Sequence, residues 1–204
     1  MRQDALITLA VLASRPEFNS ELSEHIMTIK RDHSATWDEC YECVLQTYLF
    51  AGFPAALEAA RALHRAWPED ESLPWEAEML EAFSTHEQNL ERGDELYRQV
   101  YAANANVVRG ALQTLSPELA MWAVTEGYGK TLSRPGLDIV TRELAIVGML
   151  TQLGWERQLF SHIMGARNVG ASNEQIRDAI QLGSRANEGR LNRAIGLLER
   201  AMKN

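Results

Sequence analysis

The chain has two cysteines, Cys40 and Cys43, in a C-x-x-C arrangement. This spacing occurs in thiol redox pairs, in half of many metal sites, and on the buried face of a helix. A position one turn into a helix lowers a thiol pKa slightly, whereas the negative charges of Asp38, Glu39 and Glu42 act against a thiolate. The apolar spacing around the two cysteines favours buried structural thiols. A redox pair and a metal site stay open as alternatives, although no second C-x-x-C or H-x3-5-H pair completes a zinc site.

A second group of residues able to do chemistry consists of Glu143 and His162. Glu143 falls on the apolar face of a helix predicted over 139–153, where a carboxyl group must be paired or protonated. His162 falls on the apolar face of the next predicted helix, 155–168. Because the turn near Gly154 makes these helices antiparallel, the two side chains could meet, and such a pair is suited to proton transfer. We predict Glu143 and His162 as catalytic residues; the alternative for His162 is a histidine satisfied within the core.

Several residues near this pair could bind a substrate. Arginine side chains hold carboxylates in bidentate contacts, and an aromatic ring offers a flat apolar surface. The alternative for each arginine is a solvated helix face. The predicted substrate-binding residues are Arg142, Arg157, Arg167 and Trp155.

The segment GYGKTLS at 127–133 resembles a phosphate-binding loop only superficially. The first glycine of that motif would fall on Val124, and a helix precedes the segment where a strand is required. We interpret Gly127 and Gly129 as C-caps of a helix.

Composition excludes several partners and compartments. The 204 residues carry a net charge of -8, so a nucleic-acid backbone or an anionic membrane would be repelled. Two cysteines fit a reducing compartment. The apolar run at 5–13 looks like a secretory segment, but Asp4 lies where a basic residue belongs, and a similar run recurs at 143–150. We expect a cytoplasmic protein with neither a signal peptide nor a membrane span, and with no metal or cofactor.

Nearly every segment shows helical periodicity, and none shows sustained strand-like alternation. The fold is therefore predicted to be all-α, with turns marked by Pro and Gly. The predicted helices are 3–14, 18–31, 37–51, 54–66, 74–82, 93–114, 117–127, 139–153, 155–168, 173–184 and 187–202.

Two stretches of the chain look like copies of one helical unit. Residues 23–44 align with 161–180, and both contain the triplet His-Ile-Met. Each copy then starts its next helix with a predicted capping box. In this alignment the two cysteines lie opposite Ile176 and Ala179, and Glu143 lies opposite Ala5 or Leu6, so a proton-transfer site would belong to the second copy. The predicted parts are an N-terminal repeat over 1–67, a connector over 68–93 and a C-terminal repeat over 94–204.

These stretches resemble a known family. FAGFPAALEAARALHR at 50–65 is similar to the segment that closes the helical repeat of carboxymuconolactone decarboxylase-like proteins. GYGKTLSRPGLDIVTRELAIVGMLTQLG at 127–154 and LFSHIMGARNVGASNEQI at 159–176 resemble the family's core in order and spacing. The resemblance implies the helical fold of the alkylhydroperoxidase D-like superfamily.

The resemblance also implies roles for residues. Alkylhydroperoxidase D-type proteins use a Glu, a C-x-x-C-x-x-H motif and its histidine as a proton relay, and Glu143 and His162 match the Glu and the His. The cysteine positions are occupied by Glu156 and Leu159 in the second copy and by Asn19 and Leu22 in the first. Cys40 and Cys43 are on a different helix and do not match that pair.

The missing cysteines imply the decarboxylase-like branch. The expected activity is a cofactor-free lyase that acts on a small carboxylated lactone or related catabolite. The alternatives are a non-catalytic oligomeric or binding homologue and a thiol-dependent alkylhydroperoxidase that uses Cys40 and Cys43. Substitution of the Gly-Phe-Pro signature by residues 187–190 in the second copy points to a different substrate from the family's founding one. Family members with two repeats form trimers, so a homotrimer is expected.

Overall fold

The computed structural model describes residues 2–68 and 85–203, and within them every regular element is a helix. The all-α prediction is thus confirmed. The elements are α1 Arg2–Ala13, η1 Pro16–Phe18, α2 Asn19–Asp32, α3 Trp37–Ala51, α4 Phe53–Ala66, α6 His86–Tyr101, η2 Ala102–Asn104, α7 Ala105–Leu115, α8 Pro117–Trp122, η3 Ala123–Leu132, α9 Ile139–Leu153, α10 Glu156–Asn168, α11 Asn173–Ser184 and α12 Glu188–Met202.

Eight predicted helices agree with α1 to α4 and α9 to α12 within one residue at each end. The helix predicted over 74–82 lies outside the described residues. The single helix predicted over 93–114 is wrong, because Ala102 has a left-handed φ of 47° and separates α6 from α7. The helix predicted over 117–127 continues to residue 132 as η3, a π-helix.

Both predicted capping boxes are present. The Thr36 hydroxyl accepts a hydrogen bond from the backbone N–H of Glu39, and the Glu39 carboxylate accepts one from the Thr36 N–H. Ser172 and Gln175 make the same exchange at α11. These reciprocal bonds satisfy amide groups that a helix start leaves without partners, and they fix where α3 and α11 begin.

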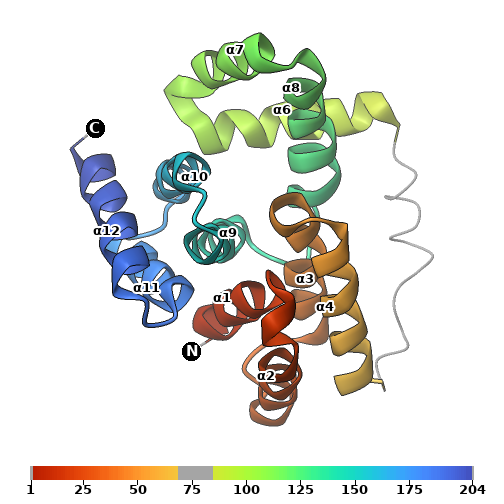
Figure 1. The fold of residues 1–204 in the computed structure, drawn as a ribbon. Coiled ribbons are helices and arrows are strands. Elements are labelled where there is room, and N and C mark those ends of the chain that lie inside the picture. Colours follow the sequence, from red (N-terminus) through yellow and green to blue (C-terminus); the bar gives the residue numbers. More distant parts are fainter. Residues whose placement is uncertain (1, 69–84, 204) are drawn as a thin grey trace. The chain divides into compact units, whose positions relative to one another are not determined.

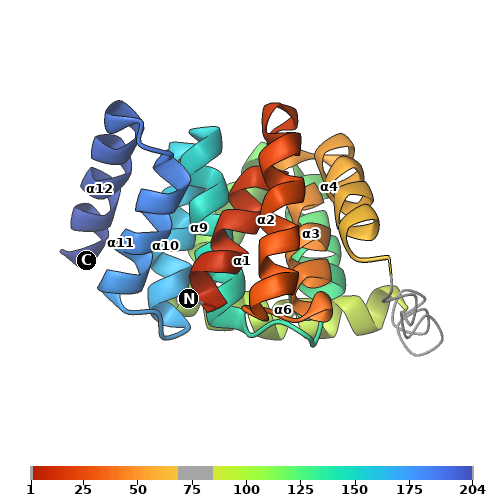
Figure 2. The same ribbon diagram turned by 90° about the horizontal axis from the view of Figure 1, so that it is seen from below.

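The described chain divides into two compact units. Unit 1 contains 2–68 and 136–203, and unit 2 contains 85–135. In unit 1, α1 and α9 pack against each other at the centre, with α2 to α4 on one side and α10 to α12 on the other (Figures 1 and 2). The central position explains why residues 141–152 of α9 are all buried, polar side chains included.

The two halves of unit 1 share one packing pattern. α1 packs on α2 and α3 as α9 packs on α10 and α11, and α4 packs on α2 and α3 as α12 packs on α10 and α11. We propose on this basis that the halves are two copies of one unit. Residues 94–135, which the sequence reading assigned to the second copy, lie in unit 2.

Two glycines allow α9 and α11 to approach closely. A Cβ atom on Gly183 would overlap the carbonyl of Gly148, and a Cβ on Gly148 would press on the Ile7 side chain. Any larger residue at position 183 would have to push the two helices apart.

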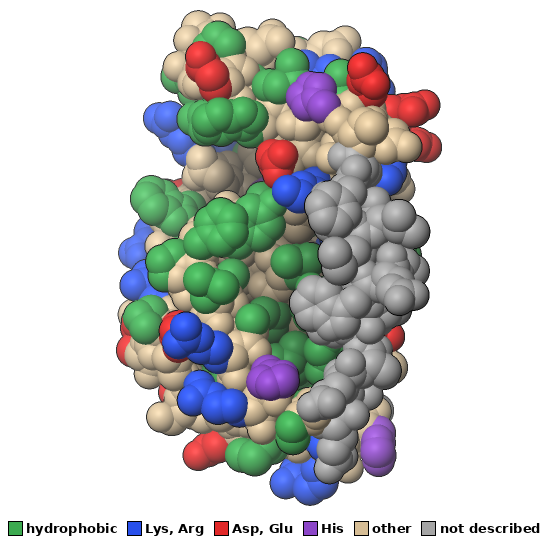
Figure 3. All heavy atoms as spheres, turned by 90° about the vertical axis from the view of Figure 1, so that its right-hand side faces the viewer, with side chains coloured by type: hydrophobic (Ala, Val, Ile, Leu, Met, Phe, Trp, Pro, Cys, Tyr) green, Lys and Arg blue, Asp and Glu red, His purple; other side chains and the backbone are tan. Residues whose placement is uncertain are grey.

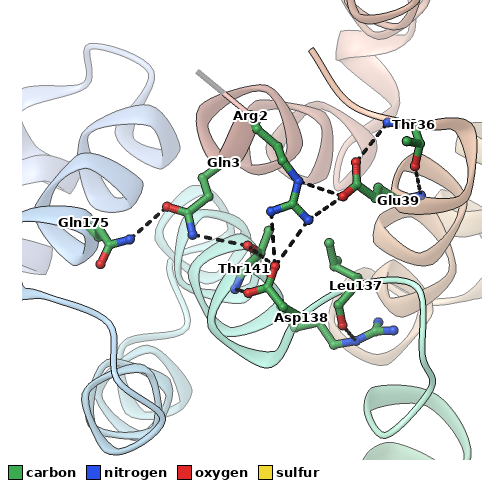
Figure 4. A network of polar contacts seen from close by, with 9 residues as sticks. Arg2, Gln3, Thr36, Glu39, Leu137, Asp138, Thr141 and Gln175 are labelled. Carbon is green, nitrogen blue, oxygen red and sulfur yellow. Dashed lines mark hydrogen bonds and ion pairs between the residues drawn. The ribbon is translucent and has the colours of Figure 1, made fainter. Parts of the chain in front are cut away.

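Polar contacts at the start of α1 tie it to three other helix starts (Figure 4). The Arg2 Nε donates to Glu39 of α3 at 2.7 Å, and its terminal nitrogens donate to Asp138, the N-cap of α9, at 3.3 Å. Gln3 donates to Thr141 at 3.2 Å and accepts from Gln175 of α11 at 2.9 Å. Two residues of α1 therefore fix the register of α3, α9 and α11.

In unit 2, α6 and η3 pack in close backbone contact. A Cβ on Gly93 would overlap the carbonyl of Val124, and a Cβ on Gly129 would overlap the carbonyl of Asn89. The interpretation of Gly127 and Gly129 as helix C-caps is wrong, since both lie inside η3. Gly129 serves close packing instead.

None of the helices in the described ranges combines the length and apolar character needed to cross a membrane.

Candidate active site

Glu143 projects from the central helix α9 into the interior of unit 1. Asp138 starts this helix by accepting the backbone N–H of Thr141, and Gly154 ends it in the left-handed conformation with φ 79°. Glu143 has no exposed surface. A carboxyl group at such a position costs stability unless a partner satisfies it.

His162 of α10 supplies that partner. Its Nδ1 lies 2.9 Å from Glu143 Oε2, and the imidazole side chain is 9% exposed. Gly154 reverses the chain so that α10 packs along α9, which brings the two predicted residues together. Because a carboxylate only accepts, an ionised Glu143 places a proton on Nδ1 and leaves Nε2 as the nitrogen free to exchange one.

The other carboxylate oxygen is unusual. Glu143 Oε1 is buried and has no hydrogen-bond partner among the described residues. Leaving a buried acceptor unsatisfied costs about 1–3 kcal/mol. Buried polar atoms of this kind are uncommon in folded proteins and are more frequent where a ligand or a solvent molecule takes part in chemistry.

Phe50 of α3 forms one wall of the site. Its ring meets the His162 imidazole at a centroid distance of 5.3 Å with the planes 85° apart, an edge-to-face contact. Sequence reasoning missed this residue, because Phe50 is separated from His162 by more than 100 positions and lies in the other half of unit 1. Its place in the apolar run before Gly52 was the available signal.

The α3 and α4 side of unit 1 is rich in exposed apolar side chains. Phe53 is 68% exposed and Leu57 is 57% exposed, and hydrophobic groups gather on this face in the space-filling view (Figure 3). Tyr48 packs on Phe53 with ring centroids 5.1 Å apart. Phe50 is partly exposed on the same helix as Tyr48, so apolar residues extend along α3 from the site toward this surface.

Arg142 is not on a solvated helix face, and the structure does not bring it to the Glu143–His162 pair as a substrate ligand. It is fully buried, and its Nη2 donates to Glu42 of α3 at 2.7 Å. Its Nε donates to the carbonyl of Leu137 at 3.2 Å, and Nη1 to Gln46 at 3.4 Å. Successive residues on a helix point about 100° apart, so Arg142 faces α3 while its neighbour faces α10. Sequence reasoning missed Glu42 as its partner.

The remaining predicted substrate-binding residues lie apart from the pair. Arg157 is exposed on the first turn of α10, and Trp155, just before that helix, is 58% exposed. Arg167 is half-buried near the end of α10, and its guanidinium donates to the backbone carbonyl of Ala201 in α12. That contact gives Arg167 a structural role in joining α10 to α12.

Cys40 and Cys43 are both free thiols with no exposed surface. Burial, and secondarily the charge of Glu39, raises the pKa of Cys40 to about 12. Burial likewise raises the pKa of Cys43, whose Sγ donates to the carbonyl of Leu6 at 3.2 Å. The prediction that the cysteines form a buried stripe on their helix is confirmed, and raised pKa values oppose nucleophilic use of the thiols.

His25, the counterpart of His162 in the first half, has a different partner. Its Nε2 lies 2.8 Å from the backbone carbonyl of Ala5. Ala5 is one of the two residues aligned with Glu143. The first half therefore keeps the histidine but offers it a carbonyl in place of a carboxylate.

Comparison with known proteins places this geometry in context. The model of the carboxymuconolactone decarboxylase family matches residues 118–199, a stretch that contains both Glu143 and His162. Peroxisomal protein 2 of Schizosaccharomyces pombe is 27% identical over 139 residues, which are 68% of this chain and 63% of that protein. The chain thus spans less than two thirds of that relative.

An uncharacterized 15.0 kDa protein in the nqo9-nqo10 intergenic region of Paracoccus denitrificans is 31% identical over 105 residues, which are 50% of this chain and 78% of that protein. The family model and this relative agree with the helical order seen in unit 1. The chain belongs to the carboxymuconolactone decarboxylase family.

Proposed function

We propose that the chain is a cofactor-free carbon–carbon lyase of the decarboxylase type, which acts on a small carboxylated lactone or a related catabolite. The observation that carries the proposal is the buried contact between His162 Nδ1 and Glu143 Oε2 at 2.9 Å. It lies inside the stretch that the family model matches.

In the proposed reaction, the bond from a substrate carbon to its carboxylate breaks and releases carbon dioxide. The electron pair enters the conjugated system of the substrate and is then used to bind a proton at carbon. The proton comes from Nε2 of protonated His162, which is later reprotonated from water. Glu143 orients the ring through Nδ1 and stabilises the imidazolium.

The unpartnered Glu143 Oε1 supports this role. An acceptor that is buried without a donor in the protein can receive a hydrogen bond from a substrate hydroxyl or from water as the reaction proceeds. Phe50, against the other side of the imidazole, supplies an apolar surface for a flat ring.

A second candidate function is a binding homologue that has lost the reaction. Arg142, a predicted carboxylate ligand, is engaged with Glu42 in the interior and offers no clamp at the surface. A thiol-dependent peroxidase is the third and is disfavoured by the burial and the raised pKa values of both thiols.

The experiment is a screen of carboxylated five-membered lactones and aromatic-acid catabolites, with carbon dioxide release and thermal stability measured on the same samples. Release of carbon dioxide from at least one compound supports the lyase. A thermal shift without release supports the binding homologue, and neither effect with any compound contradicts both.

Two broader expectations belong to the same proposal. The homotrimer implied by the family resemblance stays a prediction. A reducing compartment such as the cytoplasm suits a chain whose two cysteines are free thiols.

A further inference from the structure

Helix α7 of unit 2 exposes its apolar side. Val107, Ala111 and Leu115 follow one another at four-residue spacing and therefore share one face of the helix. Val107 is 71% exposed and Leu115 is 82% exposed. Ala105 is the only buried residue of α7. Amphipathic helices in folded domains normally turn such a face inward, so this face lacks the cover that its composition calls for.

The charged side of α7 is the side that packs. Arg109 forms an ion pair with Asp94 of α6, and its guanidinium lies 5.0 Å from the centre of the Tyr97 ring. Tyr97 is buried. The polar side thus holds α7 to unit 2 and directs the apolar side outward.

The exposed apolar series continues into α8. Leu119, four residues after Leu115, is 59% exposed, and Trp122, three residues further, is 56% exposed. α8 packs against α7 across the break at Ser116, and the two helices form one corner of unit 2 (Figure 1). We call the apolar residues Val107, Ala111, Leu115, Leu119 and Trp122 the α7–α8 surface.

Charge points to a second copy of the chain as the occupant. The whole chain carries a net charge of -8, so most of its surfaces would repel a copy of themselves. Residues 102–117 contain one charged side chain, Arg109, which is already paired with Asp94. Two such surfaces can therefore meet around a two-fold axis without repulsion between like charges.

The area also suits a pair of copies. If a fully exposed large apolar side chain presents about 150–250 Å², the α7–α8 surface offers roughly 500 Å². Two copies would then bury roughly 1,000 Å², which is the lower limit for a specific interface. We propose that the α7–α8 surface binds the same surface of a second copy in a two-fold symmetric contact.

The test is the particle mass from light scattering and sedimentation at about 100 µM, where an interface of this size should be populated. The wild type should have an even multiple of the chain mass, and Leu115→Glu/Leu119→Glu should halve it. Because both residues are exposed, the helical content of the variant should not change. If that variant does not fold, Val107→Lys replaces it.

The matched control is Leu57→Glu on α4, where an apolar side chain of similar exposure lies in unit 1. This variant should keep the wild-type mass. A monomeric wild type, an unchanged mass in the α7–α8 variants, or a mass halved by Leu57→Glu alone would overturn the proposal.

Discussion

Removal of the Arg142 guanidinium is expected to destabilise unit 1 strongly. The ion pair of Arg142 with Glu42 joins α9 to α3, and the side chains are 1% and 3% exposed. In Arg142→Met the Glu42 carboxylate would stay buried without its cation. The residues that define the candidate site, Glu143 on α9 and Phe50 on α3, are on the same two helices.

The expected magnitude follows from the burial of both charges. Breaking one side of a buried ion pair typically costs about 3–5 kcal/mol, whereas replacing both sides with apolar groups is often close to neutral. Arg142→Met should therefore lower the free energy of unfolding by about 3–5 kcal/mol, and Arg142→Met/Glu42→Leu should recover most of that loss.

Urea unfolding followed by circular dichroism measures both values. The matched control is Arg61→Met, which breaks the exposed pair of Arg61 with Glu58 on α4 and should cost less than about 1 kcal/mol. If Arg142→Met costs no more than Arg61→Met, or if the double variant is no more stable than Arg142→Met, the reasoning about the buried pair is refuted.

Three further predictions concern the thiols, the packing of glycines and the effect of pH. Ellman's reagent should label Cys40 far more slowly in the native protein than in guanidinium, because burial raises its thiol pKa to about 12; fast native labelling would contradict this. Gly183→Ala should destabilise the fold through overlap with α9, whereas Gly196→Ala, which meets nothing within 4 Å, should stabilise it by up to about 1 kcal/mol; equal effects in thermal melts would refute the packing argument. Burial alone would raise the pKa of Asp138, but hydrogen bonds from its own helix start and from Arg2 outweigh burial and hold it below its ordinary value. The stability from Asp138 is thus present above about pH 4 and lost as pH falls through the lowered pKa, so Arg2→Ala should flatten the acid limb of a stability–pH curve, and an unchanged limb would count against the contact.

The sequence predicts most helices of unit 1 because their apolar spacing and capping residues agree. Thr36 and Ser172 show this, since a hydroxyl followed three residues later by Glu or Gln fixes a helix start locally. The break at Ala102 could not be predicted in this way. Its left-handed φ of 47° occurs without Gly, Asn or Pro at that position, so tertiary packing sets it.

The candidate site was predictable only where one helix hairpin determines it. Glu143 and His162 face each other because α9 and α10 are consecutive and antiparallel, which spacing alone indicates. Arg142 and Phe50 depend on how α3 packs against the second half, and helical periodicity does not report contacts between residues about 100 positions apart. Arg142 was therefore assigned to solvent when its partner is Glu42.

The central claim is that His162 donates a proton under the control of Glu143. The most direct test is the kcat of His162→Ala beside that of His25→Ala, its counterpart on α2, with a lactone that the wild type decarboxylates. His162→Ala should lose about 100-fold or more of kcat, as expected for removal of a general acid, while His25→Ala should stay within about twofold of the wild type. A His162→Ala enzyme with wild-type kcat would contradict the account.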